Sequence, residues 1–208
     1  MAGVARLYHG ALAARGYTAD AAQLAALAAL ERCENEWIDY KARRSNAVTK
    51  LLVRPPIPRG VYMHGGVGRG KSFLMDCFFQ SVPLTRKTRL HFHEFMREVH
   101  RELQELKGTP DPLQELGRRI ARRFRLICFD EFHVSDVTDA MILHRLLEAL
   151  FANRVSIVTT SNFHPDDLYP HGLHRDRILP AIALLNDKLE VVNVDGGIDY
   201  RQQTLNRI

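Results

Sequence analysis

The sequence predicts an α/β fold in which a parallel β-sheet carries helices on both faces. Short apolar runs, typical of buried strands, alternate with longer segments whose apolar residues recur at helical spacing. This alternation favours parallel pairing, because each crossover helix returns the chain to the same edge of the sheet. A glycine-rich segment between the first apolar run and the next helix supports the same fold class. The predicted strands are residues 60–64, 89–93, 125–129, 155–160, 189–194 and 199–205, with a turn at Gly196-Gly197 before the last.

Helices are predicted before, between and after these strands. Gly16 separates two N-terminal helices, and Thr18 or Asp20 can cap the second. Asp111 can cap a later one. We expect two regions: an N-terminal helical extension over residues 1–54 and a core over residues 55–208, joined by the proline-rich connector 54–59. The predicted helices are residues 2–15, from about 18 to 44, 73–79, 94–106, 112–122, 136–151 and 175–185.

The bulk properties restrict the class of protein. A chain of 208 residues suits one domain with an extension, and a net charge of +5 favours acidic partners without indicating nucleic acid. The three cysteines form no C-x-x-C pair, which favours a reducing compartment over a disulfide framework or a zinc site. The sequence has no apolar run of membrane-spanning length and no evident secretory signal, so we expect a cytoplasmic protein.

Residues 65–72 fit the phosphate-binding pattern G-x-x-x-x-G-K-[ST]. Glycines let the backbone curl and point its N–H groups at phosphate oxygens, and the following helix N-terminus adds a partial positive charge. Lys71 would reach the β- and γ-phosphates, and the Ser72 hydroxyl would ligate Mg²⁺. The alternative is a glycine-rich turn with a chance lysine, which the flanking strand and helix disfavour. The expected nucleotide-binding residues are Gly65, Gly66, Val67, Gly68, Arg69, Gly70, Lys71 and Ser72.

Asp130 and Glu131 follow the apolar strand at 125–129. Unpaired carboxylates are costly to desolvate at the end of a buried strand, so this pair suggests a function. Asp130 would hold Mg²⁺ through its waters, and Glu131 would orient or deprotonate an attacking water. The alternative is a solvated strand end with two solubilising acids.

Polar residues after the strand at 155–160 extend the predicted site. Asn162 could bind the γ-phosphate or the water, because the carboxyl ends of parallel strands share one edge, or it could be a turn residue. Arg175 and Arg177 could stabilise the transferring phosphoryl group in a neighbouring subunit, or they could be surface arginines. Residues 20–23 could lie near an adenine, with simple helix packing as the alternative.

A basic cluster, residues 118–125, precedes the acid pair. It could bind single-stranded nucleic acid, but interleaved aromatic residues are nearly absent, so a solvated helix face is favoured.

Five segments together resemble the family of ZapE cell-division ATPases and their mitochondrial AFG1-like relatives, in the AAA+ superfamily. They are the loop at 65–72, HFHEFM at 91–96, FDEF at 129–132, TSNF at 160–163 and LHRDRILPAI at 173–182. The resemblance implies a sheet of order 5-1-4-3-2, ATP rather than GTP with Mg²⁺, Asn162 as sensor 1 and an arginine finger at Arg175 or Arg177. It also implies a nucleotide-dependent homo-oligomer that meets FtsZ or another division protein, with peripheral association at the inner membrane.

Members of that family continue into further strands and a helical lid with a sensor 2 arginine, whereas the sequence at hand stops at Ile208. We therefore expect a core that lacks the lid. Three functions follow as hypotheses: an ATPase that remodels a protein partner, a nucleotide-binding module with little turnover, and a helicase-loader-like ATPase that binds single-stranded DNA.

Overall fold

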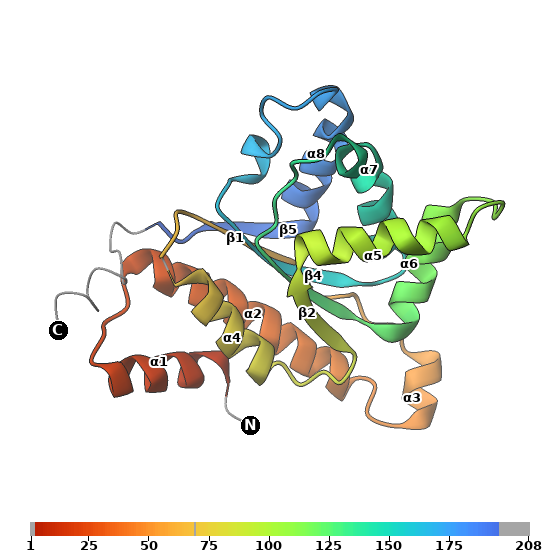
Figure 1. Ribbon diagram of the computed structural model, residues 1–208. Coiled ribbons are helices and arrows are strands. Elements are labelled where there is room, and N and C mark those ends of the chain that lie inside the picture. Colours follow the sequence, from red (N-terminus) through yellow and green to blue (C-terminus); the bar gives the residue numbers. More distant parts are fainter. Residues whose placement is uncertain (1–2, 69, 196–208) are drawn as a thin grey trace.

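One parallel five-stranded sheet, in the order β2-β3-β4-β1-β5, forms the centre of the protein (Figure 1). The computed structural model describes residues 3–68 and 70–195. This order confirms the predicted 5-1-4-3-2 arrangement and the α/β fold class. In register, Met63 lies opposite Thr160, and Phe129 lies opposite Thr159. The strands are β1 (Gly60–His64), β2 (Lys87–His91), β3 (Leu126–Asp130), β4 (Ser156–Ser161) and β5 (Leu189–Asn193).

Helices connect the strands and precede them. The α-helices in the described part of the chain are α1 (Val4–Arg15), α2 (Ala21–Ala42), α3 (Ala47–Leu52), α4 (Lys71–Ser81), α5 (Phe92–Glu105), α6 (Pro112–Arg123), α7 (Val137–Ala152) and α8 (Leu179–Lys188). Short 3₁₀ helices lie at Pro165–Asp167 and Arg175–Arg177. Two predicted caps are confirmed, since the carboxylates of Asp20 and Asp111 accept hydrogen bonds from Gln23 N (2.7 Å) and Gln114 N (3.4 Å).

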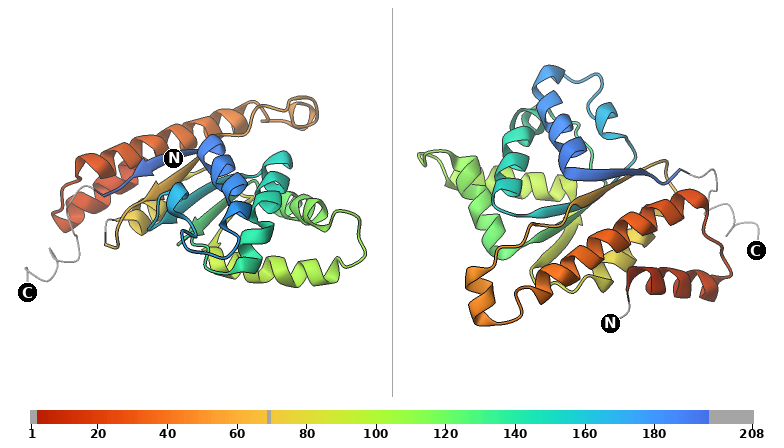
Figure 2. Two further views of the ribbon diagram at one scale, coloured as in Figure 1. Left: turned by 90° about the horizontal axis from the view of Figure 1, so that it is seen from above. Right: turned by 180° about the vertical axis from the view of Figure 1, so that it is seen from behind.

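The sheet separates two hydrophobic cores because successive strand residues face opposite sides. On β1, Val61 and Met63 pack with α1, α2 and α4, whereas Tyr62 packs with α5 to α8. The views in Figures 1 and 2 show α1, α2 and α4 on one face and α5 to α8 on the other. The N-terminal helices are therefore part of the main core, and Trp37 on α2 is fully buried there.

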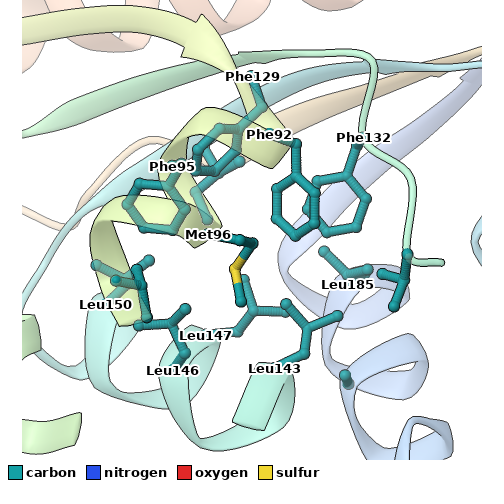
Figure 3. Packing of buried hydrophobic residues seen from close by; sticks show 14 of the residues in the cluster. Phe92, Phe95, Met96, Phe129, Phe132, Leu143, Leu146, Leu147, Leu150 and Leu185 are labelled. Carbon is teal, nitrogen blue, oxygen red and sulfur yellow. The ribbon is translucent and has the colours of Figure 1, made fainter. Parts of the chain in front are cut away.

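Phenylalanines from two separate sequence motifs pack together in the second core (Figure 3). The Phe92 ring lies 4.1 Å from that of Phe132, centre to centre, and meets that of Phe129 edge-on at 5.6 Å. Met96 and leucines of α7 continue the contact. This packing fixes the backbone on both sides of Asp130 and Glu131.

Several predicted boundaries differ from the structure. The strand predicted at 89–93 ends at His91, and helix α5 begins at Phe92 because that ring turns into the core. The helix predicted at 175–185 is divided into a 3₁₀ turn and α8, since Pro180 stands in the first turn of α8. Helix α3 was not predicted. The turn at 196–197 and the strand predicted at 199–205 lie outside the described residues.

Candidate functional site

The glycine-rich loop joins the end of β1 to the start of α4, as predicted. Gly68 and Gly70 have φ values of 83° and 82°, a left-handed conformation that favours glycine. Gly70 is the N-cap of α4, so the first amide groups of the helix face the loop. Arg69, a predicted nucleotide-binding residue, lies outside the described residues.

The Lys71 side chain is folded back over this loop. Its Nζ donates hydrogen bonds to the carbonyl oxygens of Gly65 (2.6 Å) and Gly66 (2.7 Å) and to Oδ1 of Asn162 (3.1 Å). These contacts hold the ammonium group between the loop and the end of β4, where a cation can bind an anionic ligand such as a polyphosphate.

The acid pair after β3 is tied to the end of β4. Glu131 has a left-handed φ of 54° and its backbone N–H donates to Thr160 Oγ1 (3.1 Å). Phe132 N donates to the Thr160 carbonyl oxygen (2.7 Å), and Ser161 Oγ donates to the Phe132 carbonyl oxygen (2.7 Å). A non-glycine residue in this conformation is held there by its surroundings, which is common at functional sites. The Glu131 side chain is 75% exposed and therefore accessible to a ligand.

A pocket of about 330 Å³ brings the predicted residues of three segments together. It lies at the carboxyl end of the strands, which is where ligands bind in open parallel sheets. The lining residues are Val67, Gly68, Gly70, Lys71, Ser72, Phe73, Glu131, Thr160, Ser161 and Asn162.

Asp130 is not among these lining residues, because its carboxylate is paired with Arg89. Arg89 Nε donates to Asp130 Oδ2 (2.6 Å) and Nη2 to Oδ1 (3.1 Å), and Nη1 also pairs with Asp76 on α4. Arg89 thus connects β2, β3 and the helix after the phosphate loop. Sequence reasoning missed Arg89, because Asp76 and Asp130 lie 13 and 41 residues away along the chain.

The donor atoms at this site fit Mg²⁺. The Ser72 hydroxyl and the Glu131 carboxylate line the pocket and are hard oxygen donors, whereas Asp130 lies next to Glu131 in the chain with both carboxylate oxygens bonded to Arg89. Within residues 3–68 and 70–195, no three His, Cys, Asp or Glu side chains gather into a group that could hold a metal by itself. A magnesium ion here would therefore also need phosphate oxygens and water as ligands, as is usual for this ion.

The predicted segment at 20–23 lies against the phosphate loop. A Cβ atom on Gly70 would come within 2.8 Å of Gln23 Nε2, so the two residues are in close contact. Gln23 is 3% exposed, and its Oε1 accepts a hydrogen bond from the Tyr8 hydroxyl (2.6 Å). Helices α1 and α2 therefore form one wall beside the site.

Arg175 and Arg177 lie outside the pocket of their own chain. Arg175 Nη2 donates to the Asp166 carbonyl oxygen (2.8 Å), and Arg177 Nε lies 3.6 Å from Asp176 Oδ2. Both belong to the 3₁₀ turn before α8, in which Arg177 is exposed and Arg175 is half-buried. The structure does not bring either one to Lys71.

The arginines of the basic cluster at 118–125 have different partners. Arg118 and Arg119 pair with Glu115 at 3.0 and 3.5 Å. Arg125 donates instead to the carbonyl oxygens of Asn153 (2.9 Å) and Arg154 (3.3 Å), and burial lowers its pKa.

The cysteines lie in the core rather than in the pocket. Burial raises the pKa of Cys33 to about 12 and also raises that of Cys128. Neither thiol is suited to act as a nucleophile near neutral pH.

The sheet order, the glycine-rich loop after β1 and the acid pair after β3 define the chain as a P-loop protein with the AAA+ type of α/β fold. The chain belongs to the AFG1-like ATPase family, whose model matches residues 1–208.

The chain is 55% identical over 147 residues to the cell division protein ZapE of Escherichia coli strain K12. That alignment covers 71% of this chain and 39% of the relative. A Schizosaccharomyces pombe protein named uncharacterized protein C115.02c is 41% identical over 169 residues, covering 78% of this chain and 37% of its own length. The chain thus spans about two fifths of the length of these relatives.

Solved structures support the fold. The chain resembles DnaI with a TM-score of 0.56 and 14% identity, over 86% of this chain and 85% of that one. It resembles domain III of the Thermotoga maritima replication initiation protein DnaA with a TM-score of 0.54 and 17% identity, over 80% and 67% of the two chains. At these identities the likeness concerns the fold alone.

The described part of the chain has no helix with the length and apolar character needed to cross a membrane.

Proposed function

We propose that the chain binds ATP with Mg²⁺ and hydrolyses it. The observation that carries this proposal is the convergence of Lys71, Asn162 and Glu131 on one pocket beside the glycine-rich loop. The loop amides and Lys71 would bind the β- and γ-phosphates, with Asn162 next to the γ-phosphate as sensor 1. Val67 and Arg69 would contribute through the loop backbone. The contact between Gln23 and Gly70 supports an adenine position near residues 20–23.

Ser72 and Asp130 would hold Mg²⁺, Asp130 through bound waters. When bound, the ion would neutralise negative charge on the phosphates. Glu131 would orient the attacking water and accept its proton, since its exposed carboxylate borders the pocket beside Asn162. An arginine of a neighbouring subunit, Arg175 or Arg177, would complete the site, because neither reaches the pocket of its own chain.

We further propose that ATP turnover drives the remodelling of a division protein such as FtsZ in a nucleotide-dependent homo-oligomer. The relationship to the cell division protein ZapE supports this assignment.

Calorimetric titration with ATP and Mg²⁺, followed by measurement of phosphate release, tests the proposal. Lys71→Ala should abolish nucleotide binding, whereas Glu131→Gln should bind ATP but lose turnover by about 10²- to 10⁴-fold, the usual contribution of general acid–base catalysis. If phosphate release persisted in both variants, this pocket would be excluded as the site of ATP hydrolysis. ATP binding by the unchanged chain without turnover at high protein concentration would instead identify a nucleotide-binding module.

Nucleic-acid binding is the weaker alternative, because ion pairs and carbonyl contacts divide the cluster at 118–125. Nucleic-acid binding would be supported if the chain bound single-stranded DNA with an affinity that falls steeply with salt and if charge reversal at Arg118 and Arg119 abolished this binding.

A further inference from the structure

Arg89 lies on the same face of the sheet as the helix that follows the phosphate loop. It belongs to the edge strand β2 and lies opposite Cys128 of β3 in register. Cys128 packs in the core cluster that contains Leu74 and Met75 of α4. Because residues opposite each other in neighbouring strands point to the same face, Arg89 points toward α4. This position lets one side chain contact both α4 and the end of β3.

The Arg89 guanidinium bridges two carboxylates. Its Nε and Nη2 donate to the two oxygens of Asp130, at 2.6 and 3.1 Å, while Nη1 pairs with Oδ1 of Asp76. Asp130 is the last residue of β3, and Asp76 lies in the middle of α4. Arginine remains protonated in proteins. A permanent cation therefore stands between the two acids.

These carboxylates belong to the elements that carry the proposed magnesium ligands. Asp76 lies one turn after Ser72 on α4, and both residues are exposed, so they share one face of the helix. Asp130 is itself a proposed ligand, and Glu131 beside it borders the pocket. Arg89 thus links the acidic end of β3 to the helix that begins with the phosphate-binding residues.

The pair between Arg89 and Asp130 is partly removed from solvent. Both side chains are half-buried, and charges in such a position are screened much less by salt and water than charges on the surface. A divalent ion that approaches Asp130 would be repelled by the guanidinium at short range. It would also have to compete with guanidinium N–H groups for the carboxylate oxygens. Both effects oppose the binding of a free metal ion.

We propose that Arg89 keeps divalent metal ions away from Asp130 until nucleotide phosphates are present. Phosphate oxygens would supply the negative charge that Arg89 neutralises on the protein. The exclusion of free metal concerns Arg89, Asp76 and Asp130 alone, whereas the dependence on nucleotide rests on the proposed ATP binding. Arg89 is a positioning residue, since it acts through Asp130 and does not line the pocket.

Titration with Mn²⁺ in the absence of nucleotide tests the exclusion, with the free ion measured by electron paramagnetic resonance. Mn²⁺ binds carboxylate oxygens and water as Mg²⁺ does. The unchanged chain should bind it weakly. Arg89→Met should bind it at least about ten times more tightly, the order expected when a unit charge beside a divalent ion is removed. Arg89→Lys keeps the charge and should bind as weakly as the unchanged chain, a difference that a purely structural role would not produce.

Two control variants locate the effect. Arg89→Met with Asp130→Asn should return to weak binding, because the carboxylate that the arginine had covered is then neutral. Arg101→Met also removes an arginine that pairs with two carboxylates, Glu98 and Glu105, but at an exposed position, so it should gain much less. Thermal unfolding checks each variant. Arg89→Gln, which removes the charge but keeps hydrogen-bond donors, takes the place of Arg89→Met if the methionine variant does not fold.

Three results would overturn the proposal: no tighter Mn²⁺ binding by Arg89→Met than by the unchanged chain, equally tight binding with and without Asp130→Asn, or an equal gain in Arg101→Met. Calorimetry with ATP and Mg²⁺ tests the proposed function separately. If the unchanged chain bound no ATP, the proposed function would fail, whereas a gain of Mn²⁺ binding in Arg89→Met would still support the exclusion of free metal by Arg89.

Discussion

At the scale of single residues, Arg89 joins two acidic side chains from different elements. It is 21% exposed in its side chain and Asp130 is 14% exposed, so this ion pair is largely shielded from water. Removing the arginine would leave Asp76 and Asp130 without a shared counter-charge.

We expect Arg89→Met to lower the free energy of unfolding by about 1–3 kcal/mol, the usual cost of leaving a buried polar partner unsatisfied. Urea unfolding measures the change. Arg101→Met is the matched control: Arg101 also pairs with two carboxylates, Glu98 and Glu105, but its side chain is 56% exposed. Exposed pairs contribute little, so the control should lose much less stability.

Asp130→Asn combined with Arg89→Met should recover part of the loss, because the uncompensated charge is then removed. Equal effects of the Arg89 and Arg101 variants would show that Arg89 is only a surface contact.

At the scale of elements, β1 and β4 approach closely at Gly60. A Cβ atom there would lie 1.7 Å from the Ile157 carbonyl oxygen and 2.7 Å from a methyl group of Leu189. We expect Gly60→Ala to destabilise the protein by at least about 3 kcal/mol, at the upper end of overpacking costs, since a backbone atom of the central sheet must move.

Gly10→Ala is the opposite test. Gly10 is inside helix α1, and apart from its chain neighbours and the nearby helix backbone no heavy atom lies within 4 Å of a Cβ built on it. Alanine there should stabilise the protein by about 0.5–1 kcal/mol. Thermal or urea unfolding measures the stability of both variants. A Gly60→Ala protein as stable as the unchanged protein would contradict the close approach of β1 and β4.

Local sequence patterns predicted most elements correctly. The strand at Gly60–His64 has the predicted bounds, and the loop, the caps at Asp20 and Asp111 and the acid pair lie where the motifs indicated. These features depend on neighbouring residues. The order of the strands came from the family resemblance, because pairing between distant segments leaves no local signal.

The features that sequence reasoning missed depend on tertiary contacts or on exposure. The start of α5 is decided by Phe92 packing on Phe132. The contacts of Arg89 join residues far apart in the chain. Helix α3 does have a local signal, the Asn46–Thr49 capping box, but its apolar residues face solvent, so no buried stripe marked it.

At the scale of the whole molecule, the N-terminal region and the core are one folded unit. We propose that residues 1–54 are a helical extension and residues 55–208 the nucleotide-binding core, with the two sharing one hydrophobic interior. Trp37 and Leu30 of α2 are fully buried in the cluster that contains Val61 and Met63 of β1. A chain that starts at residue 55 should therefore be insoluble or should lack cooperative unfolding. A soluble, cooperatively unfolding fragment would show that the core is independent.

The proposed homo-oligomer makes a prediction about mixtures of variants. Neither Arg175 nor Arg177 reaches the pocket of its own chain, so a neighbouring subunit would have to supply the arginine. Turnover per subunit should then rise with protein concentration. If Arg177 is the finger, Arg177→Ala alone should lose about 10³- to 10⁵-fold in turnover, the known range for arginine fingers.

Mixing separates a residue that acts between subunits from one that acts within its own. Lys71→Ala subunits lack a functional pocket but still carry both arginines, whereas Arg177→Ala subunits retain the pocket. A mixture of the two inactive variants should regain phosphate release, because the first can complete the site of the second. The same mixture made with Arg175→Ala identifies which arginine acts. Light scattering in the presence of ATP checks that the two variants assemble together. Mixed oligomers that regain phosphate release in neither mixture would exclude both arginines as groups shared between subunits.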